Sequence, residues 1–253
     1  MNMPFYVAPE QVMKDRADYA RKGIARGRAL VAVRYSEGVA MVAENSSATL
    51  RKISEIYDRI AFAGVGRYNE FDQLRVAGVR AADLKGFQYS RDDVDARSLA
   101  NQYAQILGQI FTHEMKPMEV EILVAEVGQT PEGDQMFHIN YDGTVVDKRD
   151  YAVLGGDAAA TSTRVAEACG ENRCDGLDLG AAVTTAVTAL AGPDRTISAT
   201  ELEVALLVRG GPRRCFRRLG DDEVAMLLGS ETDGAEATTA DAALITSEPT
   251  TST

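Results

Sequence analysis

The chain has 253 residues, of which 45% are hydrophobic and 26% charged, a composition typical of a soluble globular protein. Its net charge of −11, from 38 acidic and 27 basic residues, repels nucleic acid and anionic membranes and excludes a nonspecific polyanion binder. No run approaches the ~18 apolar residues of a membrane helix, and the N-terminus lacks a signal-peptide pattern. We therefore expect a cytoplasmic protein without nucleic-acid or membrane partners.

Residues 9–26 have the pattern of an amphipathic helix. Pro9 stands near its start, basic residues crowd its end, and Gly27 follows as a stop. A stripe of small and medium apolar side chains runs along one face: Met13, Ala17, Ala20 and Ile24. Because two alanines bury little area, the helix is expected to pack weakly on its own domain or against a neighbouring copy. Its basic end favours complementation of the helix dipole over polyanion binding.

The next segments predict strands and then helices. The run RALVAVRYSEGVAMVAEN, residues 28–45, indicates two antiparallel strands with Gly38 in the reversal, and residues 59–66 indicate a third, buried strand. A helix is expected over residues 69–79. The strongest helix pattern covers residues 96–112, where Leu99, Tyr103, Ile106 and Ile110 recur at helical spacing.

The second half repeats this order. Asp142 and Gly143 form a turn-prone pair between two expected strands. Cys215 is expected to face inward on a hairpin strand whose arginines face outward. The expected strands are 119–127, 135–141, 144–146, 200–208 and 212–219, and the expected helices are 157–168, 179–190 and 221–228.

Strands in groups, separated by pairs of helices, favour antiparallel sheets with helices outside them, an α/β (α+β) fold. Two facing sheets between two helix layers satisfy the pattern. We expect one domain over residues 9–229, preceded by a segment at residues 1–8. Residues 230–253 are acidic and rich in Thr, Ser and Ala, a composition that predicts disorder.

Cysteine and histidine positions argue against a metal site. The chain has three cysteines, an odd number, which favours reduced thiols. Cys169 and Cys174 have no histidine near them, since the two histidines are His113 and His138. We therefore expect neither a metal nor another cofactor.

These segments, together with KISEIYDRIAFAGVGRYNEF, LANQYAQILGQIFT and ELEVALLV followed by PRRCFRR, closely resemble the α subunits of the proteasome core particle in its actinobacterial form. The resemblance covers about residues 5–228. It implies a four-layer α/β/β/α sandwich of the N-terminal-nucleophile hydrolase fold, with an extra N-terminal helix. It also implies a homo-heptameric outer ring, stacked on rings of proteasome β subunits, that admits unfolded proteins marked by the ubiquitin-like modifier Pup.

The resemblance implies a non-catalytic subunit. In this family the β subunits carry a free N-terminal Thr at the head of the first strand, and that position here is Arg28 or Ala29, preceded by other chain. Neither side chain is a nucleophile, and no free amine stands beside it as a base. Glu44, which follows the second strand, is assigned no chemistry.

The resemblance also supplies the site residues. Lys52 corresponds to the cleft lysine that pairs with the C-terminal carboxylate of a ring-shaped AAA ATPase activator, with Val65 and Gly66 as the neighbouring wall. Without the resemblance, Lys52 would be interpreted as an exposed lysine at a helix start or strand edge. The gate that closes the pore corresponds to Met3, Pro4, Phe5, Tyr6 and Val7. Ala8 replaces a serine common in the family, which removes a helix N-cap worth about 1 kcal/mol.

Two other functions remain as alternatives. An active amidohydrolase or peptidase of the same fold would require processing that exposes Thr, Ser or Cys at the first strand, and none lies between Arg28 and Arg34. A nucleotide-binding α/β enzyme is suggested by Gly64 and Gly66 after a strand. The dinucleotide-binding pattern requires a third glycine at the position where this chain has Asn69. A tight strand-to-helix turn also explains the two glycines, without any ligand.

Overall fold

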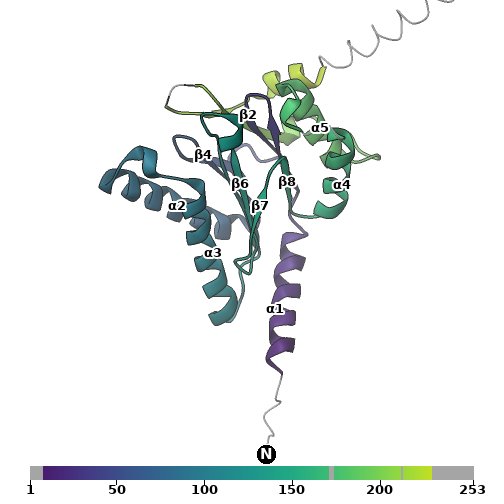
Figure 1. Cartoon of the computed structure of the whole chain (residues 1–253). Helices are drawn as coiled ribbons and strands as arrows, with labels where there is room; N and C mark the ends of the chain where they lie inside the picture. Colours follow the sequence, from purple (N-terminus) through teal and green to yellow (C-terminus); the bar gives the residue numbers. More distant parts are fainter. Residues whose placement is uncertain (1–7, 171–173, 212, 230–253) are drawn as a thin grey trace, which may run out of the picture.

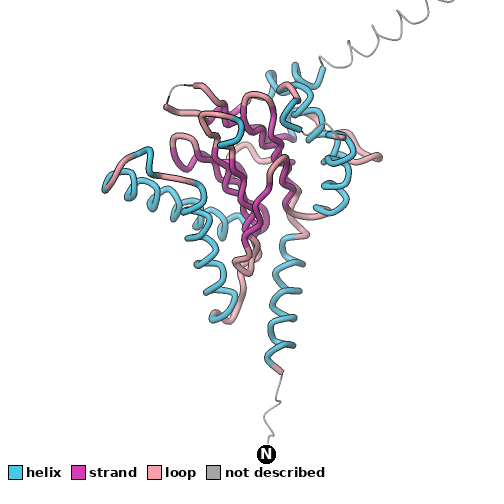
Figure 2. Tube along the Cα trace, in the orientation of Figure 1, coloured by secondary structure: helices cyan, strands magenta, loops and turns pink. Residues whose placement is uncertain are grey.

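The computed structural model describes residues 8–170, 174–211 and 213–229. Two five-stranded sheets face each other between two pairs of helices, and a further helix extends from one end (Figure 1). Figure 2 shows the strands stacked in the middle of the molecule, with helices outside both sheets. The predicted four-layer α/β/β/α sandwich with an extra N-terminal helix is confirmed.

Every pairing within the two sheets is antiparallel. The first sheet has the order β10-β9-β2-β1-β8 and contains β1 (Leu30–Tyr35), β2 (Gly38–Glu44), β8 (Tyr151–Leu154), β9 (Leu202–Val208) and β10 (Phe216–Arg218). The second has the order β3-β4-β5-β6-β7 and contains β3 (Ile53–Tyr57), β4 (Ile60–Gly66), β5 (Val120–Glu126), β6 (Gln135–Ile139) and β7 (Val145–Lys148).

One helix pair covers each sheet. The helices are α1 (Pro9–Ile24), α2 (Tyr68–Gln88), α3 (Ala96–His113), α4 (Ala158–Cys169) and α5 (Leu179–Ala191), and residues 221–229 form a further helix. The α4–α5 pair packs on the first sheet and the α2–α3 pair on the second. Short 3₁₀ turns occur at Arg91–Asp93, Pro131–Gly133, Cys174–Gly176 and Ala199–Glu201.

The β1 strand illustrates how the sequence builds this arrangement. Leu30 and Ala32 face the core between the sheets, whereas Val31 and Val33 face the core beneath α4 and α5. Successive side chains of a strand point to opposite faces, so a strand in the middle of four layers must be apolar on both. The unbroken apolar runs of β1, β2 and β4 therefore mark strands buried on both sides.

Two glycines at predicted reversals adopt backbone conformations that other residues avoid. Gly38, at the β1–β2 reversal, has φ +151°, and a Cβ there would overlap the carbonyl oxygen of Leu207. Gly143 has φ +84° and donates its N–H to the oxygen of Asn140 at 2.9 Å. Both predicted turns are confirmed, because glycine alone lacks the Cβ that these positions exclude.

The α3 helix has the burial expected from its pattern. Leu99, Tyr103 and Leu107 lie in the core between α2, α3 and the second sheet. Asp95 caps the start of the helix by accepting the N–H of Ser98 at 2.8 Å. This helix is therefore held by both a wide apolar face and an N-cap.

The α1 helix is held much more weakly. Only Ala20 and Ile24 are buried, in a small cluster with Tyr141 that is separate from the three main cores. Ala8 at the N-cap makes no side-chain hydrogen bond, in agreement with the expected loss of a cap. The helix projects from the end of the sandwich (Figure 1).

Two strands were missed and one was shorter than predicted. β3 and β8 are short, with five and four residues, and fall in runs with no long apolar pattern. Residues 212–219 were expected as a strand, but only Phe216–Arg218 pairs with β9. Cys215 is buried as predicted, whereas Arg218 turns inward to the buried carboxylate of Glu203, so not all arginines of this segment face outward.

Helix bounds also differed. α1 ends at Ile24 rather than at residue 26. The N–H of the next residue, Ala25, closes the last turn by donating to the oxygen of Arg21. α2 extends to Gln88, well past residue 79, because Leu74, Gly78 and Ala82 continue a buried stripe through its second half. The small side chains on that stripe gave a weak apolar signal.

The expectation of reduced thiols was wrong for one pair. Cys169 and Cys174 form a disulfide, with Cα atoms 5.2 Å apart. Gly170, with φ +58°, ends α4 between them, whereas Cys215 is a free, buried cysteine. The expected gate residues Met3 to Val7 and the acidic tail at residues 230–253 lie outside the described residues.

Candidate functional site at the head of strand β1

Lys52 lies directly before β3, at the position where β1 begins and β2 ends. Its Nζ donates to the carbonyl oxygen of Arg28 at 2.8 Å and to that of Glu44 at 2.9 Å. The side chain therefore points back to the head of β1, the position where the resemblance described above implies a nucleophile in the β subunits. The interpretation of Lys52 as an ordinary solvated lysine does not fit this geometry.

The environment of Lys52 makes its charge unusually easy to lose. Burial lowers the pKa of the Lys52 ammonium from 10.5 to about 8, against the opposing effect of the nearby carboxylates of Glu203 and Glu44. An ammonium has three N–H donors, and two of them are matched by the carbonyl oxygens of Arg28 and Glu44. Among the described residues no third acceptor lies on this ammonium, which leaves one donor for an anionic ligand that would also offset the cost of desolvating the cation.

Val65 and Gly66 lie beside this lysine, on the neighbouring strand β4. The Lys52 oxygen accepts the N–H of Gly64 at 2.9 Å, which places the end of β4 next to it. A Cβ on Gly27 would lie 3.2 Å from both the Val65 Cγ1 and the Gly66 N. The three residues predicted for the pocket are thus brought together around the segment that precedes β1.

The glycines of β4 are explained by packing. Gly66 has φ +108°, and a Cβ there would overlap the backbone of Glu119. A Cβ on Gly64 would lie 2.7 Å from the Phe71 ring. Both glycines therefore allow close approach of neighbouring groups of this chain, which favours a structural role over the nucleotide-binding role considered from the sequence.

Glu203 holds the loop that carries Lys52, and the sequence did not point to it. This buried carboxylate on β9 accepts the backbone N–H of Lys52 at 2.9 Å, that of Ile53 at 3.2 Å and the side-chain amide of Asn45 at 2.7 Å. Arg218 supplies its counter-charge. Four donors on one carboxylate fix residues 45–53, and with them the direction of the lysine.

Glu44 is the second buried carboxylate of the site, and it is held by two arginines. Arg195 approaches it in a bidentate arrangement, with Nη1 to Oε1 and Nη2 to Oε2 both at 3.2 Å, and Arg28 pairs with the same carboxylate. Glu44 thereby orients the carbonyl that binds Lys52. Arg195 comes from a loop 151 residues away in the sequence, which is why no local pattern indicated it.

A cavity of about 490 Å³ lies next to this cluster. It is bordered by the end of α1, the start of α4 and the end of α5, and includes Gly27, Arg28, Glu44, Thr161 and Arg195 in its lining. Lys52 is not in the lining, but Arg28 and Glu44 are, and their carbonyl oxygens bind its Nζ. The site thus combines a partly buried cation with an arginine-lined hollow.

The chemistry available here is recognition of an anion. Arg28 and Ala29 occupy the head of β1, and the chain continues before them into Gly27 and α1. A backbone amide stands where the fold's nucleophilic members need a free amine, and neither side chain carries a hydroxyl or thiol. Lys52, by contrast, offers a positive charge flanked by closely packed backbone, which suits a carboxylate.

No group of three His, Cys, Asp or Glu side chains in the described part of the chain is placed to hold a metal ion. None of the helices in the described ranges has the length and apolar character needed to cross a bilayer.

Comparison with known proteins places this chain in a family. A sequence model of the family described as proteasome subunit matches residues 24–207, most of the described chain. The chain belongs to the proteasome subunit family. A proteasome subunit alpha of Acidimicrobium ferrooxidans is 60% identical over 92% of this chain and 99% of that protein.

Two further relatives carry the same name. They come from Xylanimonas cellulosilytica, 56% identical over 87% of this chain and 93% of the relative, and from Thermobifida fusca, 54% identical over 90% and 91%. These matches confirm the expectation of a proteasome α subunit of the actinobacterial type, the non-catalytic subunit of this family.

Proposed function

We propose that seven copies of this chain form the outer ring of a proteasome core particle, stacked on β subunits, in which residues 1–8 gate substrate entry. In this proposal Lys52 receives the C-terminal carboxylate of a ring-shaped AAA ATPase activator, and unfolded proteins pass through the ring to the β chamber. The observation that carries the docking role is the Lys52 ammonium, directed at the head of β1 with one donor left for a ligand.

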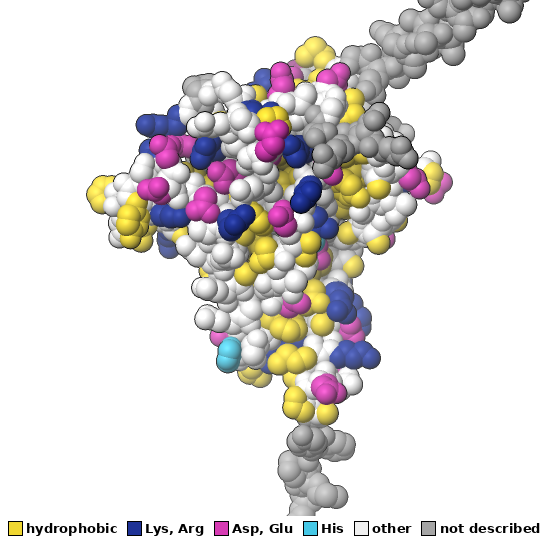
Figure 3. All heavy atoms as spheres, viewed as in Figure 1, with side chains coloured by type: hydrophobic (Ala, Val, Ile, Leu, Met, Phe, Trp, Pro, Cys, Tyr) yellow, Lys and Arg dark blue, Asp and Glu magenta, His cyan; other side chains and the backbone are white. Residues whose placement is uncertain are grey.

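Exposed apolar side chains support association with neighbouring subunits at two separate places. On α1, Val12, Met13 and Tyr19 are exposed although the helix has a face suited to packing. Figure 3 shows this projection carrying hydrophobic and basic side chains together. We assign this surface to the neighbouring copy in the ring.

The second place is the end of α2, where Leu84, Phe87 and Tyr89 are exposed, Phe87 to 90%. A patch of large apolar side chains on a soluble protein marks an interaction surface. We assign it to the β subunit, because a subunit in a stacked ring needs contacts with a second kind of neighbour besides its own copies.

Binding of a short activator-type peptide tests the pocket. We expect an assembled ring to bind a peptide with a free C-terminal carboxylate at least about tenfold more tightly than the same peptide amidated, because a charge-assisted hydrogen bond contributes about 1.5–3 kcal/mol. Lys52→Ala should remove this difference. Lys148→Ala, on the distant β7 strand, should keep it. Equal binding of both peptides by the wild type would refute the docking role.

The pH dependence of the same binding gives a second readout. The pKa of Lys52 is lowered to about 8, so the free pocket loses its positive charge as the pH rises through that value. Affinity for the carboxylate peptide should therefore fall between pH 7 and pH 10, while that for the amidated peptide changes little. Isothermal titration at several pH values measures both, and a flat profile for the carboxylate peptide would contradict the role of Lys52.

A further inference from the structure

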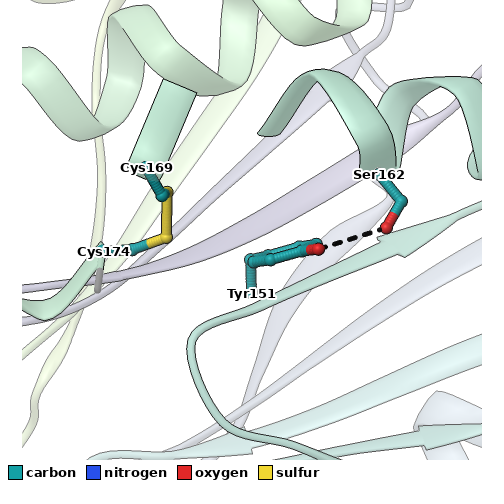
Figure 4. The surroundings of a disulfide bond; sticks show 4 residues. All are labelled: Tyr151, Ser162, Cys169 and Cys174. Carbon is teal, nitrogen blue, oxygen red and sulfur yellow. Dashed lines mark hydrogen bonds between the residues drawn. A yellow bond between two sulfur atoms is a disulfide. The ribbon is translucent and has the colours of Figure 1, made fainter. Parts of the chain in front are cut away.

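The disulfide between Cys169 and Cys174 lies outside the site described above and has no part in the proposed function. Cys169 is the last residue of α4, and Cys174 is the first residue of the 3₁₀ turn Cys174–Gly176. Both are buried in the core shared by α4, α5 and the first sheet, with Cys169 exposed to 8% and Cys174 to 1%. Figure 4 shows the bond joining the end of the helix to the segment beyond it.

The segment that the disulfide ties down connects α4 to α5 and also meets the β1–β2 reversal. Cys174 accepts the N–H of Leu177 at 3.1 Å, and Leu177 in turn accepts the N–H of Ser36 at 2.9 Å. Asp178 then caps α5 by accepting the N–H of Ala181 at 2.8 Å. The disulfide therefore attaches the end of α4 to the segment 174–178, which bonds to the β1–β2 reversal and caps the first turn of α5.

The remaining cysteine cannot easily take part in this bond. Cys215 belongs to the core between the two sheets, whereas Cys169 and Cys174 belong to the core on the outer face of the first sheet. A layer of strands separates the two cores, so exchange among the three cysteines would require unfolding. The Cys169–Cys174 disulfide is thus isolated from the third cysteine, and among the three cysteines only these two can re-form a bond with each other while the chain is folded.

We propose that Cys169 and Cys174 form a reversible redox modification site that exchanges with a low-molecular-weight thiol and its disulfide. The small thiolate attacks Cys169 Sγ, the more exposed of the two, and forms a mixed disulfide with it as the Cys169–Cys174 bond breaks and Cys174 leaves as a thiolate that takes up a proton. A second small thiolate then attacks the small-molecule sulfur of the mixed disulfide, which releases Cys169 as a thiolate that takes up a proton and forms the small-molecule disulfide. Oxidation is the reverse, with the small disulfide accepting the two electrons.

Reduction should loosen one end of the α4–α5 layer. It removes the cross-link from the connection that caps α5, while the other ends of both helices border the cavity beside Arg28 and Glu44. We expect the melting temperature to fall by about 5 °C, since closing a loop of this size stabilises the fold through the unfolded state. Carboxylate-peptide binding at Lys52 should stay unchanged, so the redox site and the docking role can fail independently.

Thiol counting in the full chain tests the site directly. Chain prepared without reductant should titrate one thiol after denaturation, that of Cys215, and three after treatment with dithiothreitol. Native chain in glutathione buffers of increasing oxidised fraction should pass from three thiols to one at equilibrium. Three thiols throughout this series, or a disulfide that dithiothreitol leaves intact in the native chain, would overturn the proposal.

Melting curves distinguish the loss of the Cys169–Cys174 cross-link from nonspecific destabilisation by reductant or by substitution. Dithiothreitol should lower the melting temperature of the wild type and of Cys215→Ser, and should have no effect on Cys169→Ser or Cys174→Ser. Because either serine variant could fail to fold, the comparison of Cys215→Ser with and without reductant decides by itself. If reduction left the melting temperature of Cys215→Ser unchanged, the stabilising role of the disulfide would be refuted. In that case hydrogen exchange of the amides of Ser36 and Ala181 would also be the same with and without reductant.

Discussion

The α1 and α3 helices are of similar length, 16 and 18 residues, yet the molecule holds them in opposite ways. α3 buries five residues and starts with a side-chain cap from Asp95, whereas α1 buries two and starts at Ala8 without one. Both have an apolar stripe at helical spacing. The difference is the size of the side chains on the stripe, since alanine buries far less area than leucine or tyrosine.

Polar contacts make up part of the support of α1. Arg16 donates to the carbonyl oxygen of Phe111 at 2.7 Å, at the end of α3. The Glu119 carboxylate lies against Gly23 and is paired with Arg67 at 2.8 Å and Lys116 at 3.1 Å. The Arg16 hydrogen bond and the Glu119 carboxylate therefore fix where α1 lies on the domain, while the apolar area that the helix buries stays small. α3 is thus an integral part of the domain core, whereas α1 is positioned by the domain but buries only two residues on it.

The largest expected effect on stability comes from truncating a buried apolar side chain in each helix. Leu107→Ala in α3 should lower the free energy of unfolding of the isolated chain by about 3 kcal/mol, because it leaves a cavity in a main core. Ile24→Ala in α1 should leave the global unfolding midpoint close to that of the wild type, since α1 can detach alone. Urea denaturation and hydrogen exchange measure both, and equal global losses would refute the separation of α1 from the domain.

A matched pair of glycines sharpens the comparison at a smaller scale. Gly108→Ala in α3 should stabilise the chain by up to about 1 kcal/mol, because alanine favours helix and its Cβ would lie an ordinary 3.6 Å from the Asp142 oxygen. Gly23→Ala in α1 has the same propensity gain, but its Cβ would overlap the Glu119 carboxylate. We expect that variant to weaken the packing of α1 on the domain by about 1 kcal/mol as the ion pairs of Glu119 shift.

Amide hydrogen exchange within α1 measures the effect of Gly23→Ala, and urea unfolding measures that of Gly108→Ala, each with the wild type beside it. Gly108→Ala serves as the control for helix propensity. If Gly23→Ala slowed exchange in α1, the Glu119 carboxylate would not restrain this helix.

The smallest expected effect concerns the start of α1. Ala8→Ser restores a side-chain acceptor at the N-cap and should stabilise the first turn by about 0.5–1 kcal/mol. Hydrogen exchange of the amides of Gln11 and Val12 should slow by a few-fold, while global unfolding stays the same. Unchanged exchange at these amides would show that the missing cap does not limit the order of α1.

Much of this architecture was predictable from the sequence because its signals are local. The alternating and continuous apolar runs of β1, β2 and β4, and the wide stripe of α3, predicted buried elements that the structure contains. The resemblance added Lys52, Val65 and Gly66, and the fold brings them together around residues 27–28. Short strands such as β3 and β8 were missed, since four or five residues carry too little periodicity.

By itself, therefore, the sequence determined the layers, the position of the first strand and the absence of a nucleophile at its head, all properties of neighbouring residues. Only the tertiary structure placed Glu203 under the Lys52 loop, paired Arg195 with Glu44 and joined Cys169 to Cys174. The first two contacts span about 150 residues. The disulfide joins the last residue of α4 to a 3₁₀ turn beyond Gly170. Such pairings are decided by where the chain packs, because no local pattern of side chains encodes the distance between segments.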